Sequence, residues 1–132
     1  MPRAVRKPPK IYFFDNGDVL GDEGARFENL VATSLLKRLH YLEDSQGYKY
    51  ELRYIRDKEG REVDFAIVKE GELEELIEVK YSDDSIARSL SYYADRLNPK
   101  KAVQIVAEIK RPYDKGKIRV TDPISYFSNF FK

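Results

Sequence analysis

The chain has 132 residues, of which 42% are hydrophobic, and this length predicts one globular domain with a buried core. Its 24 basic and 23 acidic residues nearly cancel, so no overall basic field marks it as a nucleic-acid-binding protein. It has no cysteine, which excludes disulfides and thiolate metal sites. No apolar run reaches the ~18 residues of a membrane span, and the N-terminus does not resemble a signal peptide. We therefore expect a cytoplasmic protein without a membrane partner.

The first third of the chain predicts an arm, a strand and a long helix. Residues 1–10 are basic and proline-rich, which indicates an extended arm or linker before a single domain over residues 11–132. A short apolar strand is predicted at residues 10–15. After Gly21, apolar residues recur every three or four positions, which predicts an amphipathic helix ending near residues 43–47. Its apolar stripe comprises Phe27, Leu30, Val31, Leu35, Leu36, Leu39 and Leu42.

Three strands are predicted next, as an antiparallel meander. Residues 48–56 alternate in polarity, as expected of a strand with one packed side, which carries Tyr48, Tyr50, Leu52 and Tyr54. Residues 62–68 and 75–81 are two further strands across a polar loop.

The remaining elements alternate between helix and strand. A helix is predicted over residues 82–98, with Ser82, Asp83 and Asp84 as candidate caps. Residues 101–109 form a nearly continuous apolar run, typical of a strand covered on both faces. A basic loop, a last strand at residues 117–120 and an end helix capped by Asp122 follow, with Ile124, Phe127 and Phe131 on one side of that helix. This order predicts an α/β fold with a mixed central sheet flanked by helices.

Charged residues interrupt two of the predicted strands. If the hairpin is symmetric about Glu72, Asp64 lies opposite Lys80, and Ala66 lies opposite Glu78. Glu78 and Lys80 point to one side because side chains alternate along a strand. The three charges are therefore expected on one face, unless the register slips by one residue.

Glu28 is a fourth candidate, from the first helix. It lies about 20° from Leu35 and Leu39 around the helix axis, on the stripe that faces the sheet. Burying an uncompensated ion costs several kcal/mol, so Glu28 is expected to be neutralised by a proton, by Lys80 or by a metal ion.

These groups suit phosphodiester hydrolysis. Asp64 and Glu78 would hold Mg²⁺ or Mn²⁺ through carboxylate oxygens. Lys80 would orient a water molecule or stabilise developing negative charge. The alternative is a plain cross-strand ion network, which a chain with 36% charged residues forms readily.

A basic region at residues 100–119 contains seven basic and two acidic residues. A solvated face is its simplest explanation, and contact with an anionic partner is the alternative. The candidate DNA contacts are Arg88, Lys110, Arg111, Lys115 and Lys117.

The four candidate catalytic residues resemble the pattern of the PD-(D/E)xK nuclease-like superfamily. In that family an acidic residue on the second core strand and (D/E)-x-K on the third form the metal site, often with a glutamate of the first helix. Asp64, Glu78, Lys80 and Glu28 match these roles, while Val63 stands where the family often has proline. The resemblance implies that Asp64, Glu78 and Glu28 are the metal ligands.

A narrower resemblance covers residues 10–127. The stretches "GARFENLVATSLLKRL", "YIRDKEGREVDFAIV" and "LIEVKYS" look like the C-terminal nuclease-like domain of archaeal and bacterial AAA-type ATPases. The chain has no G-x-x-x-x-G-K-[ST] loop and is not itself the ATPase. The resemblance implies a stand-alone relative or a part of such an ATPase.

Three hypotheses about function result. The first is a metal-dependent nuclease-like domain acting on DNA. The second is a catalytically silent module that keeps the fold and binds nucleic acid or a protein such as an ATPase partner. The third is an oligomerisation domain, with the aromatic residues 124–131 as the interface of a homodimer.

Overall fold

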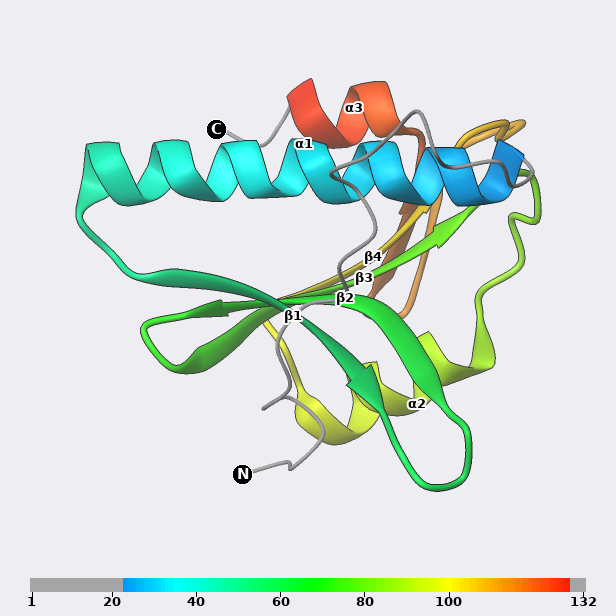
Figure 1. Ribbon diagram of the computed structural model, residues 1–132. Coiled ribbons are helices and arrows are strands. Elements are labelled where there is room, and N and C mark those ends of the chain that lie inside the picture. Colours follow the sequence, from blue (N-terminus) through cyan, green and yellow to red (C-terminus); the bar gives the residue numbers. More distant parts are fainter. Residues whose placement is uncertain (1–22, 129–132) are drawn as a thin grey trace.

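The computed structural model describes residues 23–128, which form a six-stranded sheet between layers of helices (Figure 1). The predicted α/β fold with a mixed, helix-flanked sheet is confirmed. The predicted arm at residues 1–10 and the predicted strand at residues 10–15 lie outside the described residues. The elements are α1 (Glu23–Gln46), β1 (Tyr50–Arg56), β2 (Glu62–Lys69), β3 (Glu72–Lys80), α2 (Arg88–Leu97), β4 (Lys101–Val106), β5 (Tyr113–Lys115), β6 (Ile118–Thr121) and α3 (Pro123–Ser128).

The strands lie in the order β1-β2-β3-β4-β6-β5. The first three form the expected antiparallel meander, and β4 and β6 then add in parallel. The edge strand β5 pairs antiparallel with β6. It lies within the segment that was predicted to be a basic loop. The strand was not predicted because three residues are too few to show an alternating pattern.

Each face of the sheet packs on its own helical layer. Figure 1 shows α1 and α3 on one side and α2 on the other. Ile77 belongs to the cluster under α1, whereas its neighbour Leu76 belongs to the cluster with Leu90 and Tyr93 of α2. We call these two sides the α1 face and the α2 face. The alternation along β3 therefore tells which face each of its side chains occupies.

The long helix α1 covers the sheet with Phe27, Val31, Leu35 and Leu39, which are all buried. Leu30, predicted on the same stripe, is 61% exposed. It lies about 100° from Val31 around the helix axis, at the edge of the stripe. No helix within residues 23–128 is long and apolar enough to cross a bilayer.

The second helix begins later than predicted, at Arg88, and Ala87 at its N-cap makes no side-chain capping bond. The candidate cap Asp83 instead accepts the Ser85 N–H at 3.0 Å, closing a turn before the helix. The fully buried Gln104 of β4 holds this segment. Its Oε1 accepts the Ala87 N–H at 2.9 Å, and its Nε2 donates to the Ser85 carbonyl at 2.7 Å.

The end helix α3 starts as expected, with Pro123 first and Asp122 Oδ2 accepting the Ser125 N–H at 2.9 Å. Phe127 packs against the cluster under α1, whereas Ile124 is 77% exposed. Both line one hollow beside α1, as expected for one side of the helix, and the third predicted member, Phe131, lies outside the described residues. The homodimer interface at residues 124–131 stays a prediction.

Candidate functional site

Strands β2 and β3 part at one end of their pairing. The last paired residues are Phe65 and Ile77, although β2 begins at Glu62 and β3 continues to Lys80. The start of β2 pairs with β1, and the end of β3 pairs with β4. Figure 1 shows β2 curving away from β3 at this end. We call residues 62–64 and 78–80 the β2–β3 fork.

A β-bulge lies beside the fork. Arg53 pairs with Ala66 but Ile55 pairs with Val63, so one residue of β1 spans Asp64 and Phe65 of β2. Such bulges bend a strand and redirect a side chain, and they are frequent next to active sites. The bulge therefore accounts for the bend of β2 at Asp64.

Asp64 and Glu78 bridge the fork through reciprocal bonds. The Asp64 N–H donates to Glu78 Oε1 at 3.2 Å, and Asp64 Oδ2 accepts the Val79 N–H at 2.9 Å. Two carboxylates thus take the place of ladder carbonyls where the strands have parted. Lys80 Nζ lies 3.8 Å from Glu78 Oε2. The structure therefore brings three of the four predicted catalytic residues together.

The register that predicted this meeting was wrong by two residues. Phe65 faces Ile77, which places Asp64 opposite Glu78 rather than Lys80. The hairpin turns at Glu70 and Gly71, both with positive φ, instead of at Glu72, and Glu74 is an extra residue in β3. A shift of two residues leaves each side chain on its expected face, so the three charges still lie on one face as predicted.

Glu78 and Lys80 belong to the α2 face. They pair with Gln104 and Val106 of β4, and Val106 lies in the core cluster of α2. The Glu78 side chain is only 10% exposed, whereas that of Lys80 is 36% exposed. The carboxylate is thus held inside the fork and the ammonium group reaches solvent.

Glu28 is half-buried on α1, the helix that covers the opposite face. Tyr81, directly after β3, interacts with Glu23 in the first turn of α1, and this interaction raises the pKa of Tyr81 to about 12. Within residues 23–128, however, no three Asp, Glu or His side chains form a group that could hold a metal ion. The described residues therefore group Asp64 with Glu78 only, and the role of Glu28 stays a prediction.

The pair fits a hard divalent cation. Mg²⁺ is commonly bound by one or two carboxylates and keeps several waters. Asp64 and Glu78 each use one oxygen for a backbone N–H, and a carboxylate has about four acceptor sites. Mg²⁺ or Mn²⁺ therefore suits this donor set.

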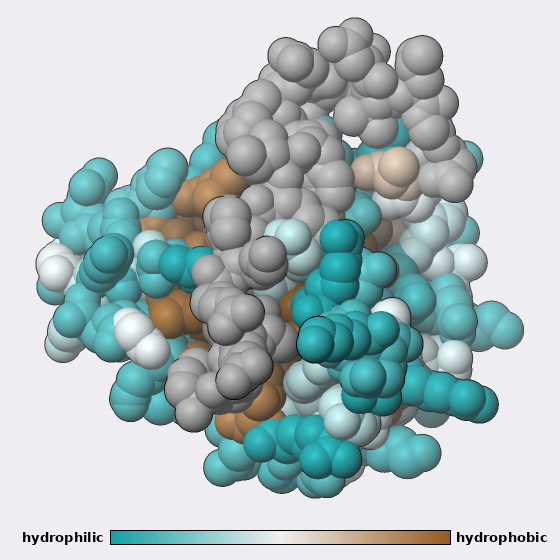
Figure 2. All heavy atoms as spheres, turned by 60° about the horizontal axis from the view of Figure 1, so that its bottom comes forward, coloured by the Kyte–Doolittle hydropathy of each residue, from teal (hydrophilic) through white to brown (hydrophobic). Residues whose placement is uncertain are grey.

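The candidate DNA contacts fall into two groups. Arg88, Lys115 and Lys117 line one hollow between α2 and the β5–β6 turn. Lys110 and Arg111 are exposed on the connection between β4 and β5. Figure 2, turned toward the side of α2, shows hydrophilic side chains over much of the visible surface. Arg88 directly follows Ala87, whose N–H donates to Gln104 of β4, and Gln104 pairs with Glu78 of β3. The first group therefore continues from the fork along the α2 face.

Gln104 is the residue that sequence reasoning missed. It is completely buried next to Glu78 and fixes the start of α2. A glutamine within the apolar run of residues 101–109 was the available signal, because buried polar side chains need hydrogen-bond partners.

The fold and site define an α/β domain with an acid pair and a lysine at a fork between central strands. The family described as "Domain of unknown function (DUF4143)" matches residues 23–126, and the chain belongs to this family. No curated protein and no solved structure gives a match.

Proposed function

We propose that the chain is a metal-dependent nuclease-like domain of the PD-(D/E)xK type, acting on DNA by phosphodiester hydrolysis at the β2–β3 fork. The observation that carries the proposal is the meeting of Asp64, Glu78 and Lys80 where the strands part. An acid pair can bind the metal ion, and a partly exposed lysine beside it can stabilise negative charge on the phosphate. Metal-dependent phosphodiester hydrolysis uses both functions.

The residues of the fork have distinct roles in this proposal. Asp64 and Glu78 hold Mg²⁺ or Mn²⁺, which when bound neutralises phosphate charge and lowers the pKa of a water molecule. Glu78 also positions the Lys80 ammonium group, 3.8 Å from its Oε2. Lys80 places its positive charge where negative charge develops on the phosphate. Its 36% exposure lets a large substrate reach it.

The basic residues of the α2 face support DNA as the substrate. A phosphate backbone is attracted to clustered Lys and Arg side chains, and its binding weakens as salt increases. Arg88, Lys115 and Lys117 line a hollow on the same face as Glu78 and Lys80. The proposed path of the backbone runs from this hollow to the fork.

Association with an ATPase is a further part of the proposal. Domains of this family are commonly found in AAA-ATPase-associated proteins. The ATPase would supply the energy for moving a nucleic acid, and this domain would supply the chemistry. The ATPase is either a separate partner or another part of a longer chain.

One observation favours a second candidate, a catalytically silent module that binds nucleic acid or a protein. The carboxylates of Asp64 and Glu78 already serve the backbone at the fork, and the described residues add no third acid to them. In this candidate the charges are structural. Salt-sensitive binding would then survive Lys80→Met, and no divalent metal would support cleavage.

Calorimetric titration with Mg²⁺ and Mn²⁺ tests the proposed metal site. We expect binding to the intact protein and its loss in Asp64→Asn, because an amide is a weaker metal ligand than a carboxylate. Asp95→Asn is the matched control, since Asp95 is exposed on α2. Absence of binding in the intact protein, or equal binding in both variants, contradicts the nuclease proposal.

A further inference from the structure

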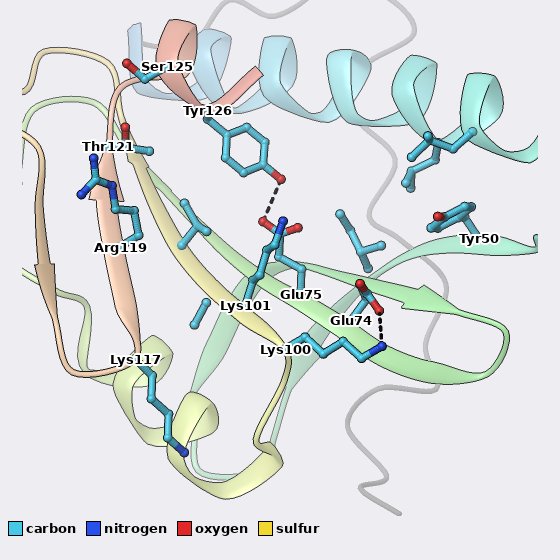
Figure 3. A pocket seen from close by; sticks show the side chains of 15 residues that line it. Tyr50, Glu74, Glu75, Lys100, Lys101, Lys117, Arg119, Thr121, Ser125 and Tyr126 are labelled. Atoms are coloured by element: carbon cyan, nitrogen blue, oxygen red, sulfur yellow. Dashed lines mark hydrogen bonds and ion pairs between the residues drawn. The ribbon is translucent and has the colours of Figure 1, made fainter. Parts of the chain in front are cut away.

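A second site with the features of a ligand pocket lies on the α1 face. It is a cavity of about 380 Å³ bounded by the sheet, the C-terminal half of α1 and α3 (Figure 3). Asp64, Glu78 and Lys80 do not line it. Its volume falls within the range of small-molecule sites, which combine apolar walls with a few converging polar groups. The cavity is therefore separate from the fork and has the size of a ligand site.

The middle of the cavity holds a buried acid. Glu75 of β3 is 6% exposed, and its Oε2 accepts the Tyr126 O–H at 2.9 Å. Burial raises the pKa of the Glu75 carboxyl, while the Tyr126 hydrogen bond and Lys101 oppose that rise. Figure 3 shows Tyr126 reaching from α3 and Lys101 from the sheet toward Glu75. This acid can exchange hydrogen bonds with a ligand inside the cavity.

One end of the cavity suits an anion. Arg119, Thr121 and Ser125 lie together there in Figure 3. A guanidinium group with two hydroxyl donors is a typical arrangement for phosphate. Arg119 Nη1 lies 2.9 Å from Asp114 Oδ2, which fixes the side chain and leaves other guanidinium donors for a ligand. Lys100, Lys101 and Arg119 line the cavity beside Glu74 and Glu75, and Lys100 pairs with Glu74 at 3.5 Å, so the lining keeps a small excess of positive charge that favours an anion.

The walls are apolar. Leu39 and Leu42 of α1 face Ile67 and Val103 of the sheet, with the ring of Tyr50 nearby. Inorganic phosphate would leave these walls in contact with water, and a purely apolar ligand would not use the hydrogen-bonding capacity that Glu75 and Arg119 retain beyond their bonds to Tyr126 and Asp114. The lining therefore fits one molecule that has an apolar part, hydrogen-bond donors and an anionic group.

We propose that this cavity binds a mononucleotide. The phosphate lies at Arg119, Thr121 and Ser125, an N–H edge of the base meets Glu75, and the base packs between α1 and the sheet. A nucleotide combines the three features in one molecule of suitable size. The proposal does not depend on cleavage at the fork, because none of the fork residues lines the cavity.

The test is calorimetric titration of the intact protein with AMP, GMP, CMP and UMP in EDTA, so that no metal at the fork contributes. We expect at least one nucleotide to bind, and its nucleoside and inorganic phosphate to bind about tenfold more weakly or worse. No binding of any nucleotide overturns the proposal. Equal binding of inorganic phosphate also overturns it, because that result shows an unspecific anion site.

Two variants separate the ends of the site. Arg119→Met should reduce nucleotide affinity to that of the nucleoside. Arg119 is exposed, so we expect little effect of this substitution on the fold. Glu75→Leu should weaken nucleotide and nucleoside equally, with circular dichroism confirming its fold. Lys58→Met, at an exposed turn position, and Asp64→Asn should bind as the unmodified protein does. Unchanged affinity in Arg119→Met overturns the assignment, while loss in Asp64→Asn would place binding at the fork instead.

Discussion

The backbone N–H of Asp64 donates to Glu78 Oε1 at 3.2 Å, one position beyond the last pair of β2 and β3. Asp64 Oδ2 in turn accepts the Val79 N–H at 2.9 Å. The two carboxylates that we assign to metal binding therefore also replace ladder bonds that the fork removes. Structure and chemistry depend on the same side chains, and substitutions must be chosen to separate them.

Two substitutions of Asp64 separate these roles. Asp64→Ala removes the acceptor of the Val79 N–H and should lower the free energy of unfolding by about 1–3 kcal/mol. Asp64→Asn retains an acceptor oxygen and should lose clearly less. Urea denaturation of both variants measures the difference. Equal stability of the two would show that the bond to Val79 contributes nothing.

Lys80→Met separates metal binding from the chemical step. Removing one group that stabilises developing charge typically costs about 100-fold to 1000-fold in rate. We expect a loss of that size in cleavage rate, with Mn²⁺ affinity retained because Lys80 is not a ligand. Lys58→Met, at an exposed turn position, is the control. A variant that cleaves at the original rate would remove Lys80 from the mechanism.

Gln104→Leu tests the residue that fixes the start of α2. The substitution leaves the Ala87 N–H and the Ser85 carbonyl without their partner, which should cost about 1–3 kcal/mol of unfolding free energy. Gln46→Ala is the matched control, because Gln46 is exposed at the end of α1. Chemical denaturation of both variants measures the cost. Equally small losses of unfolding free energy in both variants would mean that the segment before α2 does not depend on Gln104.

Glu75 gives the domain a pH dependence of defined sign. Burial raises its pKa above the value of about 4.3 found in unfolded chains, so the folded state favours the protonated acid. Its contribution to stability is complete below that value and is lost as pH rises through the folded pKa. In Glu75→Gln, the unfolding free energy measured across pH should no longer show this decrease. An unchanged profile in the variant would contradict the assignment.

The sequence predicted the main elements because their patterns are long. The α1 stripe repeats over many turns, and the apolar run of β4 contrasts with its flanks. The strand β5 has only three residues, too few for a repeating pattern, and it was not predicted. The exposure of Leu30 depends on its place at the edge of the stripe, which the pattern does not show. Asp83 was a wrong cap because a distant residue, Gln104, fixes where the helix begins. Contacts between residues far apart in sequence are the part that local patterns do not contain.

The fork itself was predictable only in part. The period of two placed Glu78 and Lys80 on one side, whatever the register. The turn at Glu70 and Gly71, the extra residue in β3 and the bulge at Asp64 together set the true register. Backbone irregularities of this kind depend on the whole sheet, which explains why the meeting of the charges was predicted but their pairing was not.

The central claim is that the fork hydrolyses phosphodiester bonds with a divalent metal ion. Incubation of the protein with Mn²⁺ and single-stranded, duplex and branched DNA, beside Asp64→Asn, tests it most directly. We predict cleavage of at least one of these substrates that requires the metal and disappears in the variant. Absence of cleavage with every metal and substrate, or undiminished cleavage by Asp64→Asn, would contradict the claim.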